Sequence, residues 1–144
     1  MNNAQLPPTC MVDARLVRLT TDVWSRLPNT VKPLIVRKVR VIAEVDSWDA
    51  FTTGELRKLG INRNLARWRE TLGVIEISRS DCDGVEDLAV LGAIVHEFGH
   101  ACQVMSRKGD VASAEKAADA TSVEWGFAKE IAALEKQRCI DNQG

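Results

Sequence analysis

The chain contains only two histidines, and both belong to one short motif. They are His96 and His100 of the segment His96-Glu97-Phe98-Gly99-His100, an H-E-x-x-H pattern. Residues four apart share a helix face, so both imidazoles can reach one metal ion. Glu97 can hold a water at an open metal position and accept its proton. The motif therefore predicts one catalytic Zn²⁺ and hydrolysis by a metal-activated water.

A catalytic zinc ion usually has three protein ligands and a water, so two histidines are not enough. The third ligand cannot be histidine, and Ser106 stands where the metzincin pattern needs one. A carboxylate is the natural choice, and Glu115, fifteen residues after His100, is the expected ligand. The competing carboxylates are Asp110, Asp119 and Glu124.

Glu115 and Asp119 are four residues apart and therefore share a helix face. With Glu115 on the metal, Asp119 can accept a hydrogen bond from the far nitrogen of a ligand histidine and fix its tautomer. Alanines around the two acids leave room for another backbone to approach. The alternative for both acids is a solvated face near a helix N-terminus, where acidic residues are favoured.

Two helices are expected to position these side chains. Asp83 begins a capping-box pattern, which predicts a helix over residues 84–107. Its predicted apolar stripe is Leu88, Leu91, Val95, Phe98, Cys102 and Met105. Gly109 breaks this helix, and a last long helix is expected from Val111 or Ser113 to Gln137.

The preceding part of the chain predicts helices and short strands. A helix is expected within residues 13–28, closed by Pro28, and a short helix over 31–38 leads into a strand over 39–46. Residues 52–59 match a short capped helix, and strands are expected around Ala66–Trp68 and over 74–78. This order predicts an α+β fold.

Length and composition indicate one domain, over residues 10–144, preceded by a flexible N-terminal arm over residues 1–9. The formal net charge of −1 gives no general attraction to nucleic acid or to acidic membranes. No apolar run has the length of a membrane span, and the N-terminal residues lack the features of a signal peptide. The expected location is cytoplasmic, with four reduced cysteines.

HEFGH followed by Glu-x-x-Ala-Asp resembles the gluzincin metallopeptidases, over about residues 85–127. The resemblance implies His96, His100 and Glu115 as zinc ligands, Glu97 as general base and Asp119 as the carboxylate behind a ligand histidine. It also implies a small zincin-like domain with an active-site helix, a short mixed or antiparallel sheet and a C-terminal helix that supplies the third ligand. The substrate would be a protein or peptide, paired with an edge strand at residues 74–78.

One departure from the gluzincin pattern concerns the oxyanion. Gluzincins commonly stabilise it with a tyrosine or a further histidine, and this chain has neither. Zinc, an arginine or backbone N–H groups would have to serve instead. The alternatives are a catalytically weak or inactive zincin-like binding module, a substrate-restricted protease effector or toxin domain, and a helical interaction protein in which HEFGH occurs by chance.

A basic stretch with one aromatic residue could contact phosphate or single-stranded nucleic acid. Its members are Arg57, Lys58, Arg63, Arg67, Trp68 and Arg69. The balanced overall charge favours a solvated face instead. DNA-associated metalloproteases would also be expected to supply a third histidine. No pattern in the sequence indicates an oligomeric state.

Overall fold

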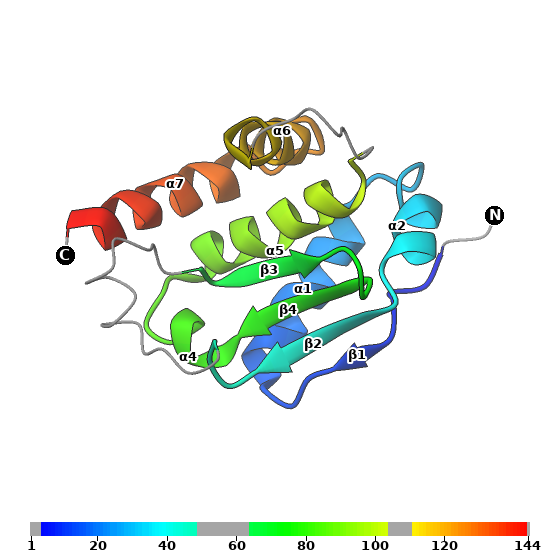
Figure 1. Cartoon of the computed structure of the whole chain (residues 1–144), viewed down its shortest axis with the longest axis horizontal. Helices are drawn as coiled ribbons and strands as arrows, with labels where there is room; N and C mark the ends of the chain where they lie inside the picture. Colours follow the sequence, from blue (N-terminus) through cyan, green and yellow to red (C-terminus); the bar gives the residue numbers. More distant parts are fainter. Residues whose placement is uncertain (1–3, 49–63, 104–110, 144) are drawn as a thin grey trace.

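A computed structural model describes residues 4–48, 64–103 and 111–143. Its elements are β1 (Thr9–Cys10), α1 (Ala14–Arg26), α2 (Lys32–Lys38), β2 (Val41–Val45), β3 (Ala66–Arg69), β4 (Val74–Ser78), α4 (Arg79–Cys82), α5 (Asp87–Ala101), α6 (Val111–Glu124) and α7 (Ala128–Gln143). Helix α5 lies between the sheet and α1 on one side and α6 and α7 on the other (Figure 1). The predicted α+β class is confirmed.

The sheet is mixed, with the strand order β1-β2-β4-β3. Strands β1, β2 and β4 are parallel, and β3 is antiparallel to β4. Ile42 of β2 pairs with Ile75 of β4, and Ile77 pairs with Ala66 of β3. The three isoleucines are fully buried in a core cluster that also contains residues of α1 and α5. The strands expected upstream of the histidine motif are therefore confirmed.

The expected flexible arm is wrong at its C-terminal end. Thr9 lies in β1 and pairs with Ile42, and the Pro8 carbonyl accepts a hydrogen bond from the Ile42 N–H at 2.9 Å. Pro7 is buried. A strand of two residues is too short to produce an alternating pattern of apolar and polar residues, so the sequence could not predict β1. Residues 1–3 lie outside the described part.

Helix α5 is present as predicted, but it starts later. Ser78 caps the short helix α4, and Asp83 ends α4 instead of starting α5. Gly84 follows with φ of +76°, a left-handed conformation that interrupts the helical path. The first residue of α5 is therefore Asp87, and its last is Ala101.

The predicted apolar stripe on α5 is only partly correct. Leu88 is 42% exposed, whereas Leu91, Val95 and Phe98 are buried. Positions outside the stripe are buried too, among them Ala89. The sheet, α1, α6 and α7 surround the helix, so it is apolar on most sides instead of amphipathic. Met105, the expected extension to residue 107 and the expected helix over 52–59 lie outside the described residues.

The expected last long helix is two helices, because the chain breaks at Gly126 with φ of +100°. Helix α7 therefore turns back along α5 (Figure 1). The two helices come very close at Gly92, where an ideal Cβ would lie 2.3 Å from the Glu130 carbonyl oxygen. Helix α6, not the C-terminal helix, carries Glu115.

Gly92→Ala is expected to destabilise the protein. The added methyl collides with backbone, which cannot move aside as a flexible side chain would. We expect the free energy of unfolding to fall by about 2 kcal/mol, despite a helix-propensity gain of about 1 kcal/mol. Urea denaturation measures the change. Gly99→Ala, whose Cβ would lie 3.0 Å from the Ala118 carbonyl oxygen, should have a smaller effect. A Gly92→Ala protein as stable as wild type would contradict this packing.

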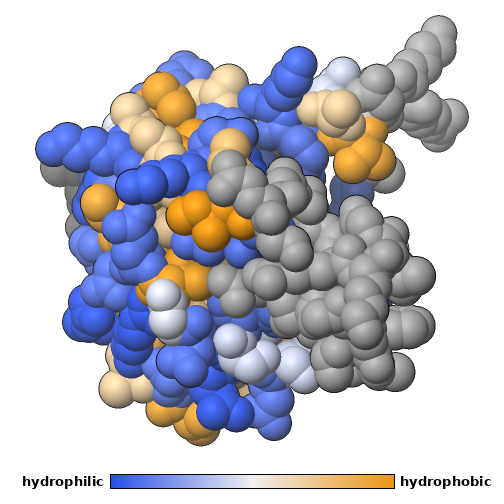
Figure 2. Space-filling view, turned by 90° about the vertical axis from the view of Figure 1, so that its left-hand side faces the viewer, coloured by the Kyte–Doolittle hydropathy of each residue, from blue (hydrophilic) through white to orange (hydrophobic). Residues whose placement is uncertain are grey.

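Among the described helices, none is both long and apolar enough to cross a membrane. Among the described residues on the face drawn in Figure 2, polar residues cover most of the surface and apolar residues form separate patches. Ionisable side chains are buried much less often than apolar side chains in folded proteins. Helix α5 nevertheless carries two neighbouring ionisable residues that are buried, His96 at 3% exposure and Glu97 at 7%.

Candidate metal centre

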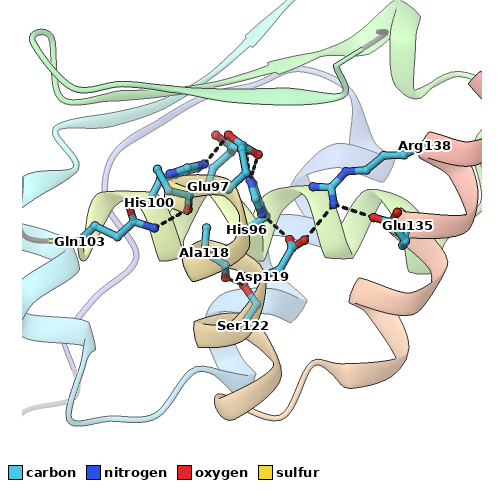
Figure 3. Close-up of polar contacts among 11 residues, drawn as sticks. His96, Glu97, His100, Gln103, Ala118, Asp119, Ser122, Glu135 and Arg138 are labelled. Atoms are coloured by element: carbon cyan, nitrogen blue, oxygen red, sulfur yellow. Dashed lines mark hydrogen bonds and ion pairs between the residues drawn. The ribbon is translucent and has the colours of Figure 1, made fainter. Parts of the chain in front are cut away.

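His96 and His100 project from α5 toward one carboxylate of α6 (Figure 3). The Nε2 atom of His96 lies 2.8 Å from Oε2 of Glu115, and Nε2 of His100 lies 2.9 Å from Oε1. The available ligand atoms of the three residues all lie within 4.8 Å of one another. His96, His100 and Glu115 could therefore hold a metal ion, as the spacing predicted.

Small residues allow α6 to come this close to α5. Gly99 faces the backbone of Ala118, which is fully buried. Near the start of α6, the Gln103 side-chain amide donates to the Ala114 carbonyl at 2.9 Å. These contacts place the backbone on both sides of Glu115, so the carboxylate reaches both imidazoles.

The other carboxylates that the sequence offered as a third metal ligand do not join His96 and His100 in this way. Asp119 lies behind His96, on the side away from the shared carboxylate (Figure 3). Glu124, at the end of α6, does not belong to the group of converging ligand atoms found among the described residues. Asp110 lies outside them.

His96 has a carboxylate at each ring nitrogen. Its Nδ1 lies 2.7 Å from Oδ1 of Asp119, and its Nε2 faces Glu115. Burial lowers the pKa of His96, but the hydrogen bonds to Asp119 and Glu115 outweigh it and raise that pKa to about 9. The metal-free ring is therefore an imidazolium that donates from both nitrogens. A metal ion would replace the Nε2 proton, while Nδ1–H still donates to Asp119.

Glu115 and Asp119 remain ionised. Hydrogen bonds from His100 and His96 hold the pKa of Glu115 far below its usual range. Burial raises the pKa of Asp119, but hydrogen bonds from His96 and Arg138 outweigh it and lower that pKa. Ionised carboxylates are the form that binds a metal ion or orients a ligand histidine.

Glu97 lies next to the three grouped residues without belonging to the group. Its Oε2 is 3.8 Å from Nε2 of His96, and its carboxylate accepts a hydrogen bond from the Trp68 backbone N–H. Burial raises the pKa of Glu97 to about 7, although His96 and His100 act in the opposite direction. A carboxylate with such a pKa is suited to take up and release protons near neutral pH.

A cleft of about 510 Å³ opens beside these side chains. One wall is β3 and the segment before it, and the other walls come from α5, α6 and α7. From α7 the lining residues are Leu134, Gln137, Arg138 and Asp141. Glu97, His96, His100 and Glu115 all line the same cleft, so a molecule bound in it would contact the candidate metal centre.

Among the strands of the described residues, β3 is the edge strand, not the strand over residues 74–78 that the sequence suggested. That strand, β4, lies inside the sheet between β2 and β3. The Leu65 carbonyl accepts a hydrogen bond from the Ser78 N–H at 2.9 Å, so Leu65 and Arg67 direct their backbone groups toward β4. In an antiparallel pair the direction alternates, and the backbone groups of Ala66 and Trp68 therefore point away from β4.

The sequence did not single out three groups at this site: the Trp68 backbone N–H, Gln103 and Arg138. Gln103 had a signal, because it follows His96 and His100 at i+7 and i+3 on one helix face. Arg138 had no local signal. It donates to Asp119 at 2.9 Å only because the chain turns back at Gly126.

The basic stretch gives no continuous surface among the described residues. Arg67 and Arg69 both contact Glu76, at 2.7 and 3.4 Å, and the Arg67 guanidinium stacks 4.3 Å from the Trp48 ring centroid. Arg57, Lys58 and Arg63 lie outside the described residues.

The chain matches no protein-family model, no curated protein and no solved structure. The site therefore has to be interpreted from its own residues and geometry. These residues form a candidate metal centre in a cleft, with an ionisable carboxylate beside it.

Proposed function

We propose that the protein is a zinc-dependent metallopeptidase in which His96, His100 and Glu115 hold one Zn²⁺. The observation that carries the proposal is the convergence of two imidazole Nε2 atoms on one carboxylate, beside Glu97 and inside a cleft. Three protein ligands of this kind leave a fourth zinc position for water.

The donor atoms fit zinc in type and spacing. Zinc binds imidazole nitrogen and carboxylate oxygen at about 2.0–2.2 Å, and a tetrahedral arrangement separates such donors by about 3.4 Å. The nitrogen-to-oxygen distances here are 2.8 and 2.9 Å. The Glu115 side chain is 49% exposed, so its carboxylate has room to move outward from these distances.

Glu97 is placed to move protons in the reaction. A bound zinc ion would polarise the scissile carbonyl and lower the pKa of a water molecule. Glu97 takes a proton from that water as its oxygen attacks the carbonyl carbon. It then donates the proton to the leaving nitrogen, so that the C–N bond breaks and an amine and a carboxylic acid result. Its pKa of about 7 in the metal-free protein suits both steps.

A peptide is the substrate that the cleft favours. The Trp68 N–H is bonded to Glu97, but the Trp68 carbonyl and both backbone groups of Ala66 face away from β4, and both residues line the cleft. An extended peptide can form backbone hydrogen bonds with such an edge as an additional strand. Side chains of α7 on the opposite wall would then contact alternate side chains of the peptide.

A second candidate function is a zinc-binding module with little or no turnover. The chain has no tyrosine and no third histidine to stabilise an oxyanion. A protease restricted to one partner protein is a variant of the main proposal.

Removing the metal separates these functions. We expect the zinc-loaded protein to cleave casein or a mixed peptide library, to lose this activity with a chelator and to regain it with one equivalent of zinc. Mass spectrometry of the products detects the new termini. Bound zinc without cleavage of any peptide would support the binding module, and cleavage that persists after complete metal removal would contradict the zinc mechanism.

Zinc affinity is expected to depend on pH. In the metal-free protein the pKa of His96 is about 9, so below that pH a proton must leave Nε2 before zinc can bind. Affinity should therefore increase between pH 6 and 9, by up to about tenfold per pH unit for one proton. Isothermal titration in buffers of different ionisation enthalpy should show proton release at pH 7. An affinity independent of pH over this range would contradict zinc binding through His96.

A further inference from the structure

Arg138 of α7 makes a contact directly behind the candidate metal centre (Figure 3). Its Nη1 donates to Oδ2 of Asp119 at 2.9 Å, and the other oxygen, Oδ1, lies 2.7 Å from Nδ1 of His96. Each oxygen of Asp119 thus has its own partner. The side chains of Arg138 and Asp119 are 29% and 26% exposed, so water surrounds the contact only in part.

We propose that Arg138 is a positioning residue of the metal centre, acting through Asp119. A carboxylate held at one oxygen can still rotate about its last side-chain bond, whereas one held at both oxygens cannot. Asp119 therefore keeps the His96 ring in the orientation that points Nε2 at the metal position. This inference rests on the proposed function, because it assigns a role in holding the same ion.

Charge supports the same role. The positive charge of the Arg138 guanidinium lies 2.9 Å from Oδ2 of Asp119, on the side opposite His96. An ionised partner at Nδ1 also makes the imidazole a better metal ligand.

The position of α7 depends on other contacts as well, so Arg138 is not needed merely to hold the helix. Arg26 of α1 contacts the buried Glu130 at 2.9 Å, and the same guanidinium lies 4.4 Å from the Phe127 ring centroid. Gly92 packs directly against the backbone of α7. Arg26 is therefore a matched control, because it anchors α7 by an ion pair without contacting the metal centre.

The second partner of Arg138 gives another control. Nη1 also donates to Oε2 of Glu135 at 3.2 Å, within the same helix. The Glu135 side chain is 63% exposed, and ion pairs in such positions contribute little. Glu135→Gln removes the negative charge from this contact and leaves the Asp119 contact in place.

The test compares zinc affinity, by competition with a chromophoric chelator, in wild type, Arg138→Met, Arg138→Lys, Arg26→Met and Glu135→Gln. We expect Arg138→Met to bind zinc about tenfold more weakly, the lower end of the effect of outer partners of metal ligands. Arg138→Lys should recover part of the loss. Arg26→Met should unfold at lower temperature with unchanged zinc affinity, and Glu135→Gln should match wild type.

Cobalt gives a readout of ligand geometry. The visible absorption spectrum of the Co²⁺-substituted protein should shift in Arg138→Met and stay unchanged in Arg26→Met. Zinc affinity and cobalt spectrum equal to wild type in Arg138→Met would overturn the inference while leaving the proposed function intact. Equal losses in Arg138→Met and Arg26→Met would also overturn it, because α7 docking would then be the cause. Failure of wild type to bind zinc would overturn both.

Discussion

Glu97→Gln is expected to abolish peptide hydrolysis while zinc stays bound. Glutamine has nearly the same shape as glutamate but cannot take a proton from water, and general base catalysis contributes about 10²–10⁴-fold to the rate. We therefore expect kcat to fall by about 10³-fold or more. Glu97 is not one of the three grouped ligands, so zinc affinity should change little.

The substitution should preserve the fold around the site. The side-chain oxygen of glutamine can still accept the hydrogen bond from the Trp68 backbone N–H. Glu124→Gln, an exposed change on α6, is the matched control and should retain full activity. The measurement is the initial rate of peptide cleavage with metal content determined on the same samples. Turnover close to wild type in Glu97→Gln would exclude Glu97 as the base.

Glu115→Ala should remove most of the zinc affinity. Glu115 supplies the only oxygen among the three converging groups, and alanine offers no replacement. Loss of an outer partner of a metal ligand costs about 10–100-fold in affinity, and loss of the ligand itself should cost more than about 100-fold. Chelator competition on the folded variant measures the change.

A graded series makes this second prediction sharper. Affinity should fall most in Glu115→Ala, less in Asp119→Asn and least in Arg138→Met, because the three residues lie at increasing distance from the metal position along the hydrogen-bonded chain. Wild-type affinity in Glu115→Ala would place the third ligand elsewhere. If Asp119→Asn bound zinc more weakly than Glu115→Ala, Asp119 would be the metal ligand and Glu115 the outer partner.

The arrangement of the site could be predicted where it depends on helix periodicity. His96 and His100 share a face because they are four residues apart, and Glu115 and Asp119 share a face for the same reason. One break between the two helices was then enough to bring the pairs together. The α+β class followed equally from local patterns, since β2 and β4 are rich in β-branched residues.

The helix boundaries and the strand order could not be predicted, because they depend on backbone conformations and long-range contacts that a local sequence pattern does not contain. Asp83-Gly84 matched a helix start, but Asp83 ends α4 and Gly84 takes a left-handed conformation before α5 begins. The expected helix to Gln137 includes Gly126, whose φ of +100° divides that helix in two. Sheet order is set by pairing between distant strands, so the sequence could not show that β3, not β4, is the edge.

The claim that His96, His100 and Glu115 hold one zinc ion is tested most directly by elemental mass spectrometry of purified, zinc-supplemented wild type beside His100→Ala. The proposal predicts about one zinc per chain in wild type and its loss in the variant, because two ligands are too few for a stable site. Circular dichroism confirms that both proteins are folded. Folded wild type without zinc, or a His100→Ala variant that keeps its zinc, would contradict the claim.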